Sequence, residues 1–216
     1  MRKWRSLFTR LVLGLMLTSM ANAVPAVTFA ELTGNVLAGP ALTAGWQFTT
    51  NSAVTVTDLG FFDDSQNGLA QAHDVGIFSA AGALLVSAIV PAGVGAPLIN
   101  QFRYSPVAPT LLGAGLTFRI GAFYAAGSPE LIRTGATGFA TDPAITFVGG
   151  RIFLGPALAD PTGVFAGNSI FGPNFNFVAA AAGAPESDGR SSGAAVASIW
   201  VMLALLQRRR RTSPTC

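Results

Sequence analysis

The sequence predicts an all-β protein: an antiparallel two-sheet β-sandwich, of which the jelly roll is one variant, flanked by an N-terminal signal peptide and a short C-terminal apolar helix. In the middle of the chain, short β-type segments are separated by Gly, Pro, Asn and Asp at intervals of about 8 to 15 residues. No apolar period of about 3.6 residues persists there for about ten residues, as a packed helix would require. Half of the 216 residues are hydrophobic and 11% are charged, so the chain can bury a core.

Strands are expected where apolar and polar residues alternate most clearly. The expected ranges are residues 45–50, 53–62, 73–79, 84–89, 101–107, 117–124, 144–153 and 174–178. In segment 117–124, the apolar residues Phe118, Ile120, Ala122 and Tyr124 share one face, because successive side chains of a strand point to opposite sides. Such half-buried strands are typical of a sandwich.

The N-terminus has the three parts of a secretory signal peptide, predicted at residues 1–23. Four basic residues precede the apolar stretch 11–17, and Ala21 and Ala23 supply the small residues that signal peptidase requires at −3 and −1. Cleavage is expected before Val24. The apolar run is far shorter than the roughly 20 residues of a spanning helix, which disfavours a permanent anchor. The single cysteine, Cys216, is the last residue, so the exported domain holds no internal disulfide.

The C-terminus carries a second targeting segment. We expect the folded domain at residues 24–178, a linker at 179–192, an apolar helix at 193–207 and a basic cytoplasmic tail at 208–216. Basic residues after an apolar helix stay on the cytoplasmic side, which holds the preceding domain outside. The apolar stretch covers roughly 21 Å at about 1.5 Å per residue, against a hydrocarbon core of about 30 Å. Both a transient and a permanent membrane association remain open.

The tail resembles that of PEP-CTERM proteins, a class of sorted bacterial proteins. The resemblance rests on Pro185 and Glu186, the short apolar helix and the cluster Arg208, Arg209, Arg210 and Arg211; Ser187 stands where the second proline of the motif would be. It implies recognition by an exosortase-like membrane enzyme, and a location on the envelope surface or outside a Gram-negative cell that makes extracellular polysaccharide. A simple C-terminal anchor is the alternative.

A second resemblance covers most of the middle domain. The order of segments 45–48, 58–63, 73–78, 84–87 and 115–122 is similar to an exported bacterial β-sandwich domain of unknown function. That family implies a surface or matrix role and supplies no catalytic residues. The alternative is a module that binds an extracellular polysaccharide, in which Trp46, Tyr104 and Tyr124 stack on sugar rings. Strand alternation favours the other interpretation of these three residues, as part of the core.

The net charge and the ionisable residues disfavour several other classes of function. Residues 24–185 hold four arginines and eight acidic residues, a net charge of −4, which disfavours nucleic-acid binding. His73 is the only histidine, so a zinc site built on several histidines is excluded. Two interpretations of His73 are open: a catalytic base, or the first residue of a strand. Two are also open for Asp63, Asp64 and Asp74: paired glycosidase carboxylates, or solvated turn residues. No enzyme activity is predicted.

One loop matches the spacing of a weak calcium site, the only cofactor predicted. Oxygen ligands fall at alternate positions, a glycine stands at the sharp turn, and a carboxylate stands at position 12. In chain order the residues are Asp63, Ser65, Asn67, Gly68, Leu69 through its carbonyl, and Asp74. The alternative is a plain hairpin turn at Asn67-Gly68 between two strands.

Overall fold

The computed structural model describes residues 22–37, 39–165 and 171–180. Residues 1–21 of the predicted signal peptide lie outside these ranges, and so do the sorting motif, the C-terminal apolar helix and the arginine tail. Within the described ranges the regular elements are all β-strands, which confirms the all-β class. No helix in that part of the chain is long and apolar enough to cross a membrane.

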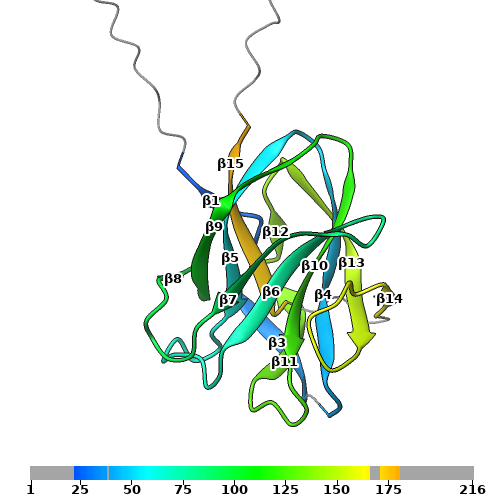
Figure 1. Cartoon of the computed structure of the whole chain (residues 1–216). Coiled ribbons are helices and arrows are strands. Elements are labelled where there is room, and N and C mark those ends of the chain that lie inside the picture. The colour runs from blue at the N-terminus through cyan, green and yellow to red at the C-terminus, as the bar shows by residue number, and fades with distance from the viewer. Residues whose placement is uncertain (1–21, 38, 166–170, 181–216) are drawn as a thin grey trace, which may run out of the picture. The chain divides into compact units, whose positions relative to one another are not determined.

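The described chain forms fifteen strands in succession (Figure 1). Their bounds are β1 Val24–Pro25, β2 Val27–Thr28, β3 Glu31–Leu37, β4 Leu42–Thr50, β5 Val54–Phe62, β6 His73–Ser79, β7 Leu84–Val90, β8 Leu98–Ile99, β9 Phe102–Leu112, β10 Thr117–Tyr124, β11 Leu131–Thr137, β12 Ala140–Thr141, β13 Ile145–Leu154, β14 Gly163–Val164 and β15 Pro173–Ala179.

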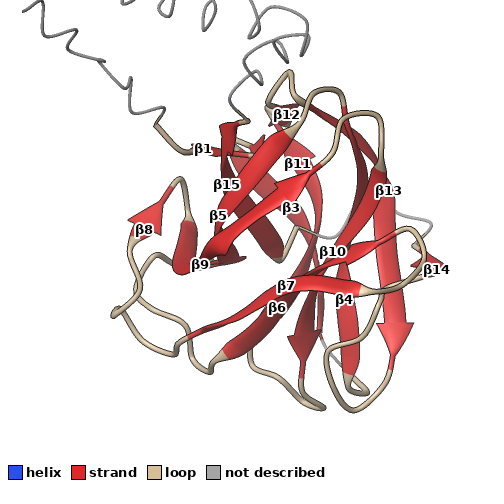
Figure 2. Ribbon diagram, turned by 45° about the horizontal axis from the view of Figure 1, so that its top comes forward, coloured by secondary structure: helices blue, strands red, loops and turns tan. Residues whose placement is uncertain are grey.

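The strands pair into two large antiparallel sheets and two small two-stranded ones (Figure 2). The five-stranded sheet has the order β1-β15-β5-β9-β8, and the six-stranded sheet has the order β14-β13-β4-β10-β6-β7. The small sheets pair β3 with β11 and β2 with β12. The chain passes from one large sheet to the other between β4 and β5, and again between β5 and β6.

The inner faces of the two large sheets share one core, as in a β-sandwich. Trp46 of β4 stacks on Phe175 of β15 with 5.9 Å between ring centroids, and its indole Nε1 donates to the Pro173 carbonyl at 2.8 Å. Phe48 packs on the same Phe175 ring at 5.0 Å. All three aromatic side chains are fully buried, so burial of apolar area between the layers is the main stabilising term.

Each strand expected from the sequence is present, with ends that shift by a few residues. The largest shift is at β9, which continues to Leu112 through Pro106 and Pro109. β9 is hydrogen-bonded to β8 only at Phe102 and Arg103, so beyond these residues one of its edges has no strand partner. A proline that lacks an N–H is tolerated on such an edge.

The β3–β11 ribbon was not predicted. Each of its strands carries a central glycine and several polar residues, in the sequences ELTGNVL and LIRTGAT, so neither shows an apolar alternation. A Cβ at Gly34 would clash with the Thr134 carbonyl oxygen, so this glycine permits the close approach of the two strands. The pairing depends on a partner about a hundred residues away along the chain, which local patterns do not reveal.

Candidate functional site

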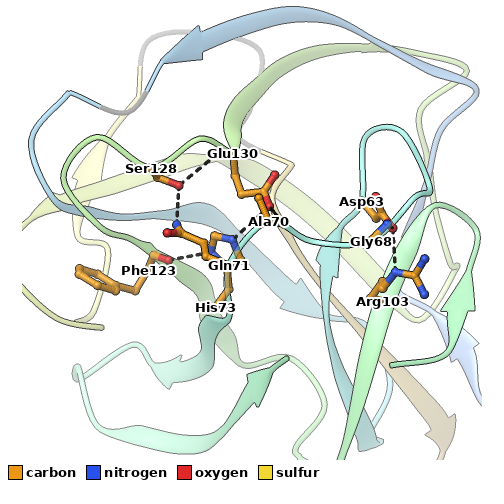
Figure 3. Close-up of polar contacts among 9 residues, drawn as sticks. All are labelled: Asp63, Gly68, Ala70, Gln71, His73, Arg103, Phe123, Ser128 and Glu130. Carbon is orange, nitrogen blue, oxygen red and sulfur yellow. Dashed lines mark hydrogen bonds and ion pairs between the residues drawn. The ribbon is translucent and has the colours of Figure 1, made fainter. Parts of the chain in front are cut away.

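The polar side chains cluster where three connections meet: the β5–β6 loop, the start of β9 and the β10–β11 loop. Figure 3 shows two groups there, one around Asp63 and Arg103 and one around His73 and Glu130. Both groups draw residues from loops that are distant in sequence, so they are the first places to look for chemistry.

Asp63 and Arg103 form a buried ion pair. The Arg103 Nε donates to Asp63 Oδ2 at 2.7 Å, and the side chains are 6% and 2% exposed. The same Asp63 oxygen accepts the backbone N–H of Gly68 at 2.9 Å. Because Asp63 follows β5 and Arg103 belongs to β9, the pair ties the β5–β6 loop to its neighbouring strand.

Three of the four remaining N–H donors of Arg103 are also engaged. Its Nη1 donates to the carbonyls of Val94 and Ala96 at 3.1 and 2.9 Å, and its Nη2 donates to the Gln66 carbonyl at 3.4 Å. Together with the bond to Asp63, these contacts use four of the five N–H donors of the guanidinium. The arginine therefore fastens the loops 63–68 and 93–97 to β9.

The residues of the predicted calcium loop occupy different environments. Asp63 is buried and bound by Arg103, whereas Asp74 is exposed on β6; Ser65 and Asn67 are exposed, and the Leu69 carbonyl accepts the Gly93 N–H at 2.7 Å. Among the described residues, no group of three or more His, Cys, Asp or Glu side chains could hold a metal ion.

The loop contains a local turn, but the hairpin predicted at Asn67-Gly68 is wrong, because β5 and β6 belong to different large sheets. The Gln66 N–H donates to the Asp63 carbonyl at 3.1 Å, and Gln66 and Gly68 have φ of 56° and 109°. A left-handed backbone at glycine costs little, and it places the Gly68 N–H against the Asp63 carboxylate. Asp63 thus acts as an internal cap of its own turn.

His73 is fully buried at the start of β6. Its Nδ1 lies 3.0 Å from the Phe123 carbonyl of β10, so Nδ1 carries the proton of the neutral ring. Burial lowers the pKa of His73 from 6.5 to about 4, and the hydrogen bond to the Phe123 carbonyl offsets part of this. The imidazole is therefore neutral at neutral pH.

Glu130 lies close to His73, and no sequence pattern marks it as a site residue. Its Oε1 lies 4.0 Å from His73 Nε2 and accepts the Ala70 N–H at 2.6 Å. Burial raises the pKa of this carboxyl group, and Asp63 and Asp64 add to the effect. A second bond, from Gln71 Nε2 to Ser128 Oγ at 2.5 Å, joins the same two loops.

Ser128, His73 and Glu130 are the residue types of a hydrolase triad, but their hydrogen bonds differ from those of a triad. The Ser128 Oγ binds Gln71 and accepts the backbone N–H of Glu130 at 3.2 Å. Within the described ranges no hydrogen bond joins Ser128 to His73, and the histidine's Nδ1 faces a backbone carbonyl. An activated nucleophile requires a bond to its base, so the cluster as built fastens loops.

The aromatic residues predicted to contact a glycan belong to the core. Trp46, Tyr104 and Tyr124 are 0%, 2% and 0% exposed. Trp46 lies between the large sheets, and Tyr124 packs on Phe61 at 5.4 Å. The prediction for these three residues is wrong, because each lies on the buried face of its strand.

The adjacent acids predicted as a carboxylate pair bind separate arginines. Asp63 pairs with Arg103, and the carboxylate of Asp64 pairs with Arg133 Nη2. Asp74 is exposed on β6. Asp63 and Asp64 are therefore each paired with a cation, whereas the two carboxylates of a glycosidase act on one substrate.

The predicted processing and sorting residues fall largely outside the described ranges. Val24 begins β1 and pairs with Phe177 of β15, and Ala23 is exposed just before it. Ala21, Pro185, Glu186 and the four terminal arginines lie outside the described residues. No protein-family model and no curated protein matches the chain.

Proposed function

We propose that the protein is an exported, noncatalytic β-sandwich domain that acts at the cell surface or in the extracellular matrix. The observation that carries the proposal is that charged side chains of the domain pair with one another. Arg103, Arg119 and Arg133 each bind an aspartate of another segment, and His73 is buried and neutral. These groups brace the loops of the fold, which supports a binding or structural role over chemistry.

Export through a cleaved signal peptide is supported by the position of the first strand. Among the described residues, backbone pairing starts at Val24, which follows the predicted cleavage site and lies opposite Phe177. Removal of residues 1–23 would therefore leave every strand pair of the described fold intact. A domain whose described part contains no cysteine also suits an exported protein that depends on its core.

Sorting through the tail is the second part of the proposal. β15 ends at Ala179, so the Pro185-Glu186 motif follows the last strand by a few residues, within reach of a membrane enzyme. The apolar helix predicted at 193–207 would hold the chain in the membrane until an exosortase-like enzyme cuts it. The jelly-roll variant of the sandwich is the finer fold we propose, supported by the repeated passage of the chain between the two large sheets.

Intact mass and N-terminal sequencing of protein recovered from the envelope and the medium of the native host test the proposal. We expect an N-terminus at Val24 and loss of residues 193–216 from the released form. A chain that starts at Met1 in the envelope overturns the signal-peptide assignment. An uncut C-terminus on protein that stays membrane-bound overturns sorting in favour of a simple anchor.

A polysaccharide-binding module remains the second candidate function. The buried aromatic residues do not support it, but the outer face of the six-stranded sheet presents other side chains. Here the outer face means the side of β4, β10 and β13 that points away from the core, where Gln47, Arg119 and Arg151 lie.

A further inference from the structure

Arg151 differs from every other arginine in the described part of the chain. Arg103, Arg119 and Arg133 are each ion-paired with an aspartate. Arg151, on the outer face of β13, has no carboxylate partner among the described residues, and its Nε donates to the amide oxygen of Gln47 at 2.9 Å. A guanidinium is a favourable donor for a carboxylate, so one that has no carboxylate partner among the described residues is a candidate anion-binding group.

The strand and its neighbour hold this guanidinium in one orientation. Gln47 of β4 fixes Nε, and Nη1 lies 3.3 Å from the Gly150 carbonyl. Within the described residues, Nη2 makes no hydrogen bond and is not among the buried unpartnered atoms. Because the side chain is already ordered, binding an anion here would cost little side-chain entropy.

Phe153 lies on the same side of β13 as Arg151. The two residues are two positions apart, about 6.7 Å along a strand, and Ile152 between them packs against the core. Phe153 is 41% exposed, and its ring lies over Gly155, where a Cβ would come within 2.8 Å of Cε1. Val164 of β14, opposite Arg151, is 74% exposed. An exposed aromatic ring therefore adjoins the guanidinium of Arg151.

We propose that Arg151 and Phe153 bind an acidic sugar, a uronic acid unit of an anionic polysaccharide. The carboxylate would accept from Arg151, and the C–H face of the sugar ring would pack on Phe153. The domain's net charge of −4 gives no general attraction for anions, so recognition has to be local. This inference rests on the proposed role at the surface or in the matrix and names the chemistry of its partner.

Binding of the mature exported protein to polygalacturonate, by calorimetry, tests the inference. Fully methyl-esterified polygalacturonate differs only in its carboxylates, and we expect it to bind at least about tenfold more weakly, the size of a charge-assisted hydrogen bond. Arg151→Gln should weaken binding of the acidic polymer by a similar factor. Arg151→Lys keeps the charge but loses the planar fork, so its affinity for the acidic polymer should lie between those of the parent protein and Arg151→Gln.

The matched control for the aromatic contact is the next residue of β13. Phe153→Ala should weaken binding, whereas Leu154→Ala, an exposed side chain on the other side of the strand, should not. Unchanged melting curves would show that all variants fold. Equal affinity of Arg151→Gln and the parent protein, or of the acid and its ester, overturns the inference. Polyglutamate binding as tightly as polygalacturonate also overturns it, because the partner would then be an acidic peptide.

The two proposals fail separately. If the protein is processed at Val24 and in its tail but does not bind polygalacturonate, the acidic-sugar proposal is overturned and the surface role stands. If the protein binds polygalacturonate but keeps both ends, the processing proposal is overturned and the acidic-sugar site stands.

Discussion

The imidazole of His73 lies flat on the ring of Phe61, with 3.6 Å between ring centroids and 6° between planes. The two rings come from β6 in one large sheet and β5 in the other, and both are buried. Tyr124 meets the imidazole edge-on at 5.5 Å. Protonation of His73 would thus place a charge within an aromatic cluster away from water, with the Glu130 carboxylate 4.0 Å from its Nε2.

We expect this burial to make stability depend on pH. The folded-state pKa of His73 is about 4 and its ordinary value is 6.5, so between these values the unfolded state binds more protons. Stability should be complete above about pH 6.5 and fall by about 3 kcal/mol towards pH 4. Denaturant unfolding at a series of pH values measures this slope.

His73→Asn is the test variant, because an amide donor can still reach the Phe123 carbonyl but does not titrate. Its stability should change less with pH than that of the parent protein over the same window. Glu130 works in the opposite direction, since its raised pKa makes its ionisation cost stability as pH rises. Glu130→Gln should therefore steepen the slope. Equal slopes for the parent and His73→Asn would show that the imidazole does not control the transition.

Replacing only one partner of the Asp63–Arg103 ion pair should lower the free energy of unfolding substantially. Arg103→Met leaves the Asp63 carboxylate buried without its cation, and we expect a loss of about 3–5 kcal/mol in the free energy of unfolding. The double variant Asp63→Asn with Arg103→Met removes the buried charge as well and should recover part of that loss. If the double variant is no more stable than Arg103→Met, desolvation of Asp63 is not the cause.

Calcium should not stabilise the loop between Asp63 and Asp74. Asp63 is bound by Arg103 and the Gly68 N–H, so equal melting temperatures are expected in chelator and in about 10 mM calcium. A bound ion at about ten times its dissociation constant would add about 1.4 kcal/mol, or roughly 3 to 6 °C. Asp74→Ala is the control, and a calcium-dependent rise that this variant abolishes would restore the metal assignment.

The phenol of Tyr124 is buried without a hydrogen-bond partner in the described structure. Tyr124→Phe should therefore leave stability unchanged or raise it by up to about 1 kcal/mol, because the unpaired hydroxyl carries a desolvation penalty. Gly172→Ala should cost about 1–3 kcal/mol, since its Cβ would press on that hydroxyl.

Combining Tyr124→Phe with Gly172→Ala should reduce the cost of the alanine, because the atom nearest to its Cβ is gone. Thermal melts of the two single variants and the double variant complete the cycle. Strict additivity would place the strain of Gly172→Ala elsewhere, for example against Phe61, whose ring lies 3.5 Å from the same Cβ position.

The strands of the large sheets could be predicted because alternation is a local property. Residues 117–124 form β10, and Phe118, Ile120, Ala122 and Tyr124 are all buried, as their period of two indicates. The β3–β11 ribbon could not be predicted, because its strands lack that period and are stabilised by each other.

The candidate site was much harder to predict than the fold. Asp63 and His73 could be singled out from the sequence, but their partners Arg103 and Glu130 lie far along the chain and carry no motif. Loop positions follow from the packing of the strands that they connect, so only tertiary structure brings these side chains together.

By itself, the sequence determined the all-β class and the strands of the two large sheets, because period-two patterning reports which residues share a face. Tertiary structure decided which faces are buried: it placed Trp46 and Tyr124 between the layers and left Phe153 and Arg151 outside. Alternation defines two faces of every strand without marking the inner one. That choice is made when the sheets stack and the larger apolar area leaves water.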